Sequence, residues 1–399
     1  MNYQPQIILD GKPVEKITAF LFPNGGNDDP KQLIANAGKS FVGSYVLGMG
    51  FTFDDTNEKA TSIAQMQELI EKDARNSERI FPYIGGEEVN SSPTHSHHRY
   101  VINFGEMSED EARKWPDLMA IVEEKVKPDR LKQNREIRAR NWWRFGENTP
   151  ALFKAIGQCN RVLAVARVGP YGSFTFLPSN TVYSEQLIVI SIPTDNAFCV
   201  LQSRIHEIWA RFFGSSMGDT LRYTPSDCFE AFPFPENWET DEALETIGQT
   251  YYEFRAALMV QNNQGLTATY NRFHDPEETD PDILKLRDLH SQMDRAVLNA
   301  YGWQDIDITC DFRLDYEDED DTNTKRKKPW RYSWPEATHD EVLARLLTLN
   351  QQRYDDEALM GKTKKSSTKT NPKKPPAKPP KTTHQINLIQ PETEQLDLL

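Results

Sequence analysis

One stretch of the sequence has the chemistry of phosphate binding. Residues 125–144 hold eight lysines and arginines and only two acids, Asp129 and Glu136. If this stretch is one helix, five polar residues recur every three or four positions and share a face, namely Lys127, Arg130, Asn134, Arg138 and Asn141. Such a face could contact DNA phosphates, which fix the orientation of a protein on a duplex. A solvated helix with scattered charge is an equally open interpretation, and Trp142 and Trp143 are expected in the core.

A second group of polar side chains lies on a predicted turn between two strands. Residues 162–166 are apolar on both faces, so we expect a strand that is covered on both faces. The four residues 169–172, Gly-Pro-Tyr-Gly, then indicate a tight turn. The turn is tipped by Arg167, Tyr171 and Ser173. An ion pair of Arg167 with Glu185 on a neighbouring strand is the structural alternative to a role in binding.

Two further motifs contain residues that catalyse reactions in other proteins. The segment 94–99, Thr-His-Ser-His-His-Arg, contains three histidines. A metal site needs ligands that converge in a defined geometry, so a polar surface loop is the favoured interpretation. The segment 270–276 contains Arg272, His274 and Asp275. Because no nucleophile accompanies them, we interpret it as a polar turn that fixes two helices. We predict no catalytic residue and no metal ligand.

The remaining patterns predict an α+β fold. Ser108 with Glu111 forms a capping box, which predicts a helix that starts at Ser108. Apolar residues at helical spacing predict further helices at 62–73, 201–212, 243–259, 281–300 and 339–353. Extended patterns predict strands at 6–9, 14–21, 41–53, 101–104, 173–177 and 182–192. We therefore expect a mixed β-sheet domain with packed helices, then a helical domain and a disordered Lys/Pro-rich tail.

Composition limits the possible classes of protein. The 399 residues include 46 basic and 60 acidic ones, which argues against a protein that simply coats DNA. It does not exclude a protein that concentrates its positive charge in one groove. The four cysteines lie far apart and form no CxxC pair, which is typical of a reducing cytoplasm. No apolar run is long enough to span a membrane, and we expect a cytoplasmic protein without membrane contact.

A long ordered series of motifs resembles the MmeI-like family, type IIG/IIL restriction–modification enzymes whose methyltransferase half modifies adenine in DNA. The matching pieces include SFVGSYVLGMGF (40–51), IFPYIGGEEVNSSP (80–93), RYVINFGEMSEDEARKWP (99–116), WWRFGENTPALFKAI (142–156), YSEQLIVI (183–190), LQSRIHEIWARFFGSS (201–216) and LRYTPSDCFEAFPFP (221–235). Pieces further on, such as YNRFHDP (270–276) and LRDLHSQMDRAVLNAYGW (286–303), resemble the helical C-terminal region of the same family. The resemblance covers roughly residues 7 to 357.

The resemblance implies double-stranded DNA as the partner and a role for particular residues. In the family the base-reading side chains come from a segment that matches 166–185 here. Arg, Asn and Gln are the side chains that pair well with base edges in the major groove. We therefore expect base reading by Arg167 and Tyr171, with Ser173 third. We expect phosphate contacts from six residues, Lys127, Arg130, Arg138, Arg144, Arg222 and Tyr223.

The same resemblance suggests four parts of the chain. Residues 1–30 would be a connector from a methyltransferase domain, 31–236 a target recognition domain, 237–357 a helical C-terminal domain and 358–399 a disordered tail. The tail is rich in lysine and proline, which is typical of a solvated linker. Its last residues, Gln395–Leu399, resemble the peptide by which bacterial proteins dock on the DNA sliding clamp. An incidental tail is the alternative for that peptide.

The catalytic motifs of the resembled family are not recognisable in the sequence. An adenine methyltransferase needs an Asn/Asp-Pro-Pro-aromatic loop for the flipped base, and no such tetrapeptide occurs. We therefore expect S-adenosylmethionine to bind a separate methyltransferase domain or subunit, encoded upstream, and no cofactor to bind this chain. The alternatives are a chain that methylates DNA only with a partner chain, and an inactive remnant or interaction protein.

Overall fold

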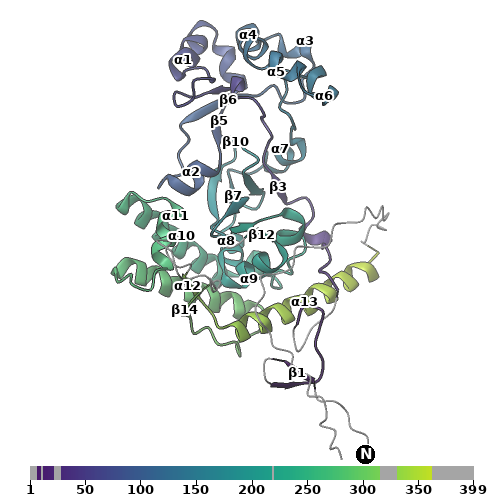
Figure 1. Cartoon of the computed structure of the whole chain (residues 1–399), viewed down its shortest axis with the longest axis vertical. Helices are drawn as coiled ribbons and strands as arrows, with labels where there is room; N and C mark the ends of the chain where they lie inside the picture. The colour runs from purple at the N-terminus through teal and green to yellow at the C-terminus, as the bar shows by residue number, and fades with distance from the viewer. Residues whose placement is uncertain (1–6, 10–11, 22–27, 218–219, 315–329, 362–399) are drawn as a thin grey trace, which may run out of the picture.

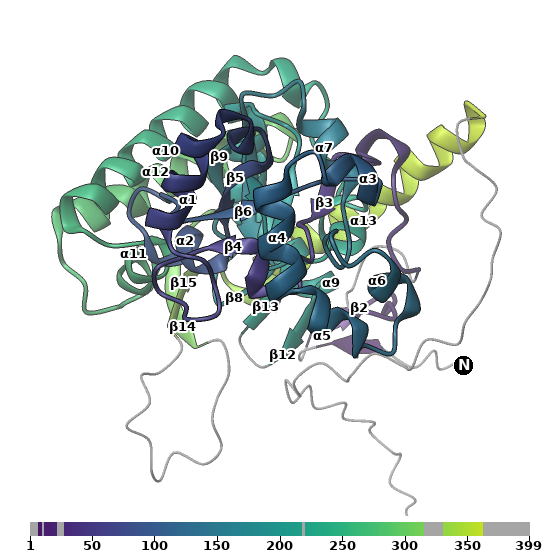
Figure 2. The ribbon, with the colours of Figure 1, turned by 90° about the horizontal axis from the view of Figure 1, so that it is seen from above.

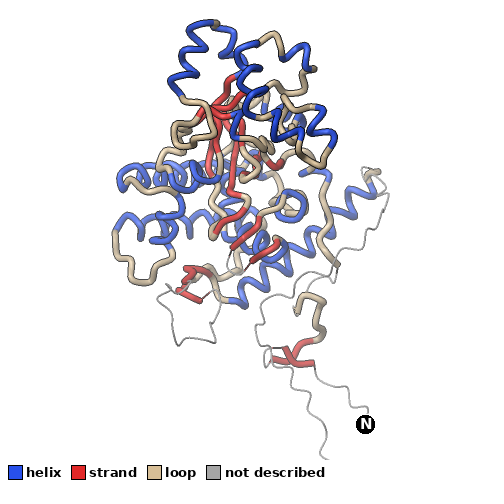
Figure 3. Tube along the Cα trace, turned by 45° about the horizontal axis from the view of Figure 1, so that its top comes forward, coloured by secondary structure: helices blue, strands red, loops and turns tan. Residues whose placement is uncertain are grey.

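The computed structural model describes residues 7–9, 12–21, 28–217, 220–314 and 330–361 (Figure 1). Helices gather at both ends of the main body of the molecule, and most of the strands run between them (Figure 3). The predicted α+β class is confirmed. Most of the predicted tail, including Gln395–Leu399, lies outside the described residues. Of the helices that the structure describes, none combines the length and the apolar composition of a membrane span.

The central sheet contains the strand that the sequence predicts to be covered on both faces. Its antiparallel order is β3 (Ser40–Val42), β11 (Leu187–Ile190), β7 (Arg161–Ala166) and β9 (Thr175–Pro178). Residues 162–165 of β7 are fully buried. They share one core with α7 (Pro150–Ile156), α8 (Asp195–Gln202) and α9 (Arg204–Phe213). The burial of these residues confirms the prediction. A β-strand without a polar side can be stable only between two layers.

A second sheet supports the upper end of the molecule. Its order is β10 (Val182–Tyr183), β5 (Ile80–Ile84), β6 (Arg99–Ile102) and β4 (Thr52–Phe53). Its own core lies beneath the helices and helical turns of this end, α1 (Ile63–Lys72), α3 (Glu109–Ala112), α4 (Pro116–Lys125), η2 (Met49–Phe51) and η3 (Ala74–Arg79). The short helix α2 (Gly86–Ser91) instead contributes Val89 to the larger core. The predicted capping box is confirmed, since Ser108 and Glu111 cap α3 reciprocally.

The segment 182–192 is not the single strand that the sequence predicts. The structure divides it into β10, which runs parallel to β5, and β11, which lies antiparallel to β7 and β3. A turn separates the two strands, closed by a hydrogen bond from the Leu187 amide to the Ser184 carbonyl (3.0 Å). One extended segment thus joins both sheets and fixes their relative position.

A small third sheet extends the central one on one side. It has the order β12 (Ser215–Met217), β13 (Thr220–Arg222) and β8 (Val168–Gly169). Figure 2 shows β8, β12 and β13 along the same side of the molecule as the short helices α5 (Lys127–Leu131) and α6 (Glu136–Arg140). The two regions with candidate DNA contacts therefore share a side.

The C-terminal region is helical, as the sequence predicts. Its helices are α10 (Glu242–Asn262), α11 (Leu266–Phe273), α12 (Pro281–Ala300) and α13 (Glu336–Leu359), and a hairpin of β14 (Asp311–Leu314) and β15 (Trp330–Ser333) precedes α13. Asp241 and Asp280 cap α10 and α12. The larger core continues from β7 into these helices, so the boundary predicted at 236/237 falls inside one continuous core.

Short elements complete the fold. They are the hairpin of β1 (Ile7–Leu9) and β2 (Lys12–Val14), and the single turns η1 (Ile34–Asn36), η4 (Pro225–Phe229) and η5 (Trp238–Thr240). The helix predicted at 201–212 is α9 joined to the end of α8. The two helices separate at Ser203, whose extended backbone (φ −65°, ψ 156°) breaks the helical path.

Candidate nucleic-acid interface

The basic stretch forms two short helices rather than one. α5 ends at Leu131, and α6 begins at Glu136. A turn of four residues changes the direction of the chain, so the face predicted for 127–141 does not exist as one surface. Each of its cations must therefore be placed separately.

Arg130 faces the protein interior. Its side chain is 1% exposed, and Nη2 donates to the Val46 carbonyl (2.9 Å). Burial lowers the pKa of Arg130 to about 10. The predicted phosphate contact is wrong for this residue, because its guanidinium joins α5 to the upper core and does not reach the surface.

Two other predicted phosphate contacts are already engaged within the protein. Arg144 donates to the carbonyls of Met107 (2.9 Å) and Glu106 (2.8 Å). Lys127 pairs with Glu123 (2.5 Å) and lies over the Trp142 ring, 4.6 Å from its centroid. Both side chains remain partly exposed. Trp142 is 4% exposed and Trp143 is 6% exposed, which confirms their prediction as core residues.

The cations at the other end of the stretch differ in exposure: the Arg135 side chain is 65% exposed, and the Arg138 side chain is 17% exposed. Arg138 and Arg135 both approach the exposed carboxylate of Glu147, at 3.2 and 3.5 Å. Arg140 is exposed, and among the described residues it has no hydrogen-bond or ion-pair partner. The most available positive charge therefore lies on α6, and it includes Arg140, which the sequence analysis did not select.

A chain of contacts joins α6 to the end of β7. Glu147 exchanges two backbone hydrogen bonds with Tyr45, both 3.2 Å long. The Tyr45 hydroxyl in turn accepts from Nη1 of Arg167 (2.7 Å). The suggested ion pair of Arg167 with Glu185 is not the contact that the structure shows. Instead, the partly exposed Arg167 is connected through Tyr45 and Glu147 to the cations of α6.

The adjoining third sheet adds a second exposed arginine. Arg222 on β13 lies directly opposite Val168 on β8, and both side chains are exposed. Arg222 has no side-chain partner among the residues that the structure describes. Its neighbour Tyr223 is fully buried, and its hydroxyl lies 2.9 Å from Nε2 of His206. The predicted phosphate contact is therefore wrong for Tyr223, while Arg222 stays a prediction.

The turn after β8 is directed into the protein. The Tyr171 hydroxyl donates to Oδ1 of Asn271 (2.8 Å), and its ring stacks on His274 with centroids 5.1 Å apart. Ser173 is 4% exposed. Burial contradicts base reading by Ser173, and the contacts of Tyr171 make it a packing residue of the turn. Of the three predicted base readers, Arg167 stays the candidate.

Sequence reasoning missed Gln186, which the fold brings beside Arg167. The Arg167 amide donates to the Gln186 carbonyl (2.7 Å), so the two residues are cross-strand neighbours. Gln186 is exposed, and its Oε1 accepts from the Gly86 amide (3.0 Å). Because the pattern predicted one unbroken strand over 182–192, Gln186 was not placed at a sheet end. A turn signal at Ser184-Glu185 could have identified it.

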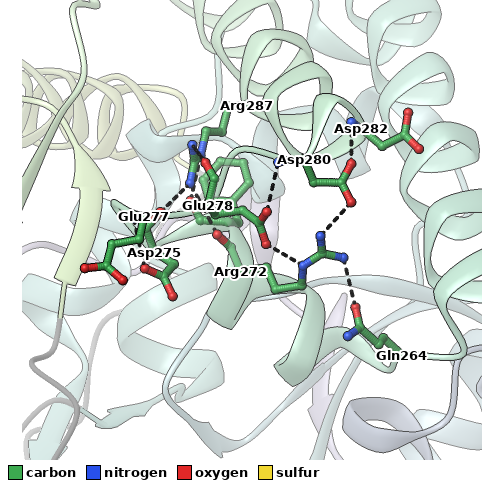
Figure 4. A network of polar contacts seen from close by, with 9 residues as sticks. Gln264, Arg272, Asp275, Glu277, Glu278, Asp280, Asp282 and Arg287 are labelled. Carbon is green, nitrogen blue, oxygen red and sulfur yellow. Dashed lines mark hydrogen bonds and ion pairs between the residues drawn. The ribbon is translucent and has the colours of Figure 1, made fainter.

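The two motifs that the sequence analysis interpreted as structural are the segments 94–99 and 270–276. The described residues contain no group of three or more His, Cys, Asp or Glu side chains that could hold a metal ion. In the other motif, Arg272 lies between the carboxylates of Glu278 (2.6 Å) and Asp280 (2.7 Å), and Arg287 donates to nearby carbonyls (Figure 4). Residues 270–273 form the end of α11 and only 274–276 lie in the connection to α12, so the predicted turn is shorter than 270–276, while the contacts of Arg272 and Arg287 do join the two helices.

Two comparisons relate this chain to known proteins. The family model of the MmeI target recognition domain matches residues 28–236. The chain is also similar to a solved structure, that of the type IIL restriction–modification enzyme MmeI in complex with DNA, with a TM-score of 0.54 and 17% identity. This match covers 86% of the chain and 39% of the MmeI chain, and at this identity it shows a shared fold. No curated protein matches.

Proposed function

Because this chain belongs to the MmeI target recognition domain family, we propose that it recognises a short sequence in double-stranded DNA. Its specificity would direct a restriction–modification enzyme. The observation that carries the proposal is the match of the family model through residues 28–236, which is more than half of the chain. The match includes both the α5–α6 segment and the strands that present Arg167 and Arg222.

The surface chemistry supports this function despite the acidic composition. Cations that bind phosphate must be accessible, and each good phosphate contact makes binding dependent on salt. Arg140 and Arg222 are the strongest candidates, and Lys127, Arg138 and Arg144 could contribute through their exposed parts. Arg167 is the proposed base reader, because a guanidinium can pair with two acceptors of one guanine.

We propose that the methyl transfer itself takes place in a separate domain or subunit that binds S-adenosylmethionine. The passage from β5 through Gly85-Gly86 into α2 has the strand–glycine–helix order of a nucleotide-binding turn. Its amides are already occupied, however, because Gly85 donates to Glu88 (2.9 Å) and Gly86 donates to Gln186 (3.0 Å). These residues do not fit a bound cofactor, and no step of methyl transfer is assigned to them.

The proposal is tested by selecting bound duplexes from a random pool with the full chain at low salt. We expect one short sequence to be enriched, and we expect no methyl transfer when S-adenosylmethionine is added to the chain alone. The Arg140→Gln variant should bind all sequences less tightly without changing the enriched one. A pool that shows no enrichment would contradict sequence recognition. Methylation of DNA by the single chain would contradict the proposal that methyl transfer takes place in a separate domain or subunit.

A further inference from the structure

The turn at 169–172 is held by one residue of the matched recognition domain and by residues from outside it. Two guanidinium groups converge on one backbone carbonyl at its tip, that of Pro170. Arg211 of α9 donates to this oxygen at 2.6 Å, and Arg331 of β15 donates to it at 2.9 Å. A turn carbonyl at the surface can be satisfied by water. Two charged donors are therefore more than the fold of this turn requires.

The aromatic residue of the turn is held by the same region. The Arg331 guanidinium lies 4.7 Å from the centroid of the Tyr171 ring, and His274 stacks on that ring at an interplanar angle of 13°. Nδ1 of His274 accepts from the Tyr332 amide (3.0 Å), which ties the end of α11 to β15. The cavity beside this joint has a volume of only about 10 Å³, which is room for roughly one water molecule.

The polar network in Figure 4 keeps this holding surface rigid. Arg287 of α12 donates to the Phe273 carbonyl (2.9 Å) and the Asp275 carbonyl (2.8 Å), on either side of His274. Arg331 is 7% exposed and His274 is 8% exposed. Because buried side chains that are held by hydrogen bonds have few alternative positions, the surface behind the turn is well defined.

The turn is directly connected to both candidate reading arginines. Arg167 immediately precedes β8, and Pro170 immediately follows it. On the other side, β8 pairs with β13 in the register that places Val168 opposite Arg222. A shift of the Pro170 carbonyl would therefore displace β8, and with it the backbone from which Arg167 and Arg222 project. Glycines flank the turn and would allow many conformations if it were released.

We propose that Arg331 and His274 are positioning residues for DNA sequence reading, so that the C-terminal helical region sets the geometry of the recognition turn. The inference rests on the proposed function. Arg331 and His274 do not touch DNA. They hold the turn 169–172 and strand β8 in the orientation that lets Arg167 and Arg222 meet the duplex together. Loss of the contacts that Arg331 and His274 make with the turn should therefore reduce discrimination between DNA sequences more than it reduces the overall affinity for DNA.

The test compares three variants with the unmodified chain. Arg331→Met removes the hydrogen bond to Pro170 and the cation over Tyr171, and Arg331→Lys keeps a charged donor of similar length. Arg345→Met is the matched control, because Arg345 is an arginine of the same region that pairs with Asp305 (2.9 Å) far from the turn. Affinity is measured for the selected duplex and for a scrambled duplex at two salt concentrations.

We expect Arg331→Met to lower the ratio of specific to nonspecific affinity about tenfold or more, with an unchanged salt slope on the scrambled duplex. Arg331→Lys should restore most of the ratio, and Arg345→Met should leave it unchanged. An unchanged ratio in a folded Arg331→Met variant would overturn the inference. If unmodified protein already shows no preferred sequence, the proposed function fails instead.

A milder variant keeps the test decisive if Arg331→Met does not fold. Asn271 is exposed, so Asn271→Ala should leave the fold intact while removing the acceptor of the Tyr171 hydroxyl. We expect this variant to lower the specificity ratio about threefold. The same ratio as in the unmodified chain would count against positioning of the turn by the C-terminal region.

Discussion

The basic stretch at 125–144 and the turn at 169–172 with its neighbours Arg167 and Ser173 are both predicted to face DNA, but the fold uses them differently. In the basic stretch, Arg130 and Arg144 donate to backbone carbonyls of the upper core, and α6 keeps the accessible charge. At the turn, Tyr171 packs on the C-terminal helices, while Arg167 before the turn and Arg222 on the paired strand β13 stay at the surface. Residue type thus indicates which region of the chain contacts DNA, while burial decides which side chains of that region can reach it.

The largest expected effect distinguishes a structural cation from an accessible one. Arg130→Ala should lower the free energy of unfolding by about 3 kcal/mol, because it creates a cavity and leaves the Val46 carbonyl without its donor. Arg140→Gln should change that free energy by less than about 0.5 kcal/mol, as is usual for surface substitutions. Urea denaturation measures both. Equal stability of the two variants would show that Arg130 does not anchor α5.

The pH dependence of stability should report the buried histidines of the lower core. Burial lowers the pKa of His206 to about 3, and it also lowers the pKa values of His274 and His290. A folded-state pKa below the unfolded value of 6.5 means that protons bind preferentially to the unfolded chain. The contribution of His206 is therefore complete above about pH 6.5 and falls as the pH decreases toward 3, by about 1.4 kcal/mol per pH unit, and His274 and His290 act in the same direction.

Urea denaturation of the unmodified chain and of His206→Gln at pH 7 and pH 5 checks this expectation. The variant should lose about 2 kcal/mol less than the unmodified chain between the two pH values. The difference between two pH values does not depend on how much the substitution itself destabilises the protein. Identical losses in both proteins would mean that His206 is not kept neutral by burial.

Replacement of Arg167 should separate base reading from its contact with Tyr45. Arg167→Ala should change the preference at one base pair by about 1–3 kcal/mol, the usual contribution of a bidentate contact. Tyr45→Phe removes only the hydroxyl that accepts from Arg167 and should leave the base preference nearly unchanged. Selection from a random duplex pool shows both outcomes. If Arg167→Ala unfolds the protein, the residue is structural.

The smallest expected effect concerns the accessible charge on α6. Neutralising Arg138 and Arg140 together should weaken binding to every sequence about tenfold and reduce the salt slope by roughly one for each lost phosphate contact. The enriched sequence should stay the same. Affinity measured across a salt series provides the slope, and an unchanged slope would remove α6 from the interface.

Local patterns in the sequence were sufficient for many elements. The helices α1, α10 and α12 follow from apolar residues at helical spacing, and the start of α3 follows from Ser108 and Glu111. These features depend on residues within one or two turns of each other, so no tertiary information is needed. The strand at 161–166 could be predicted for a similar reason, since its apolar residues occupy both faces.

The sequence by itself determined the family, the α+β class and the two regions that carry candidate contacts. The tertiary structure alone decided that Arg130 is buried, that Arg140 and Arg222 are accessible, and that Gln186 lies beside Arg167. Arg130 and its acceptor Val46 are 84 residues apart in the chain, and Tyr45 and Arg167 are 122 apart. Partners at such separations meet only when the sheets assemble, so no local pattern shows which cations the fold will bury or bond within the protein.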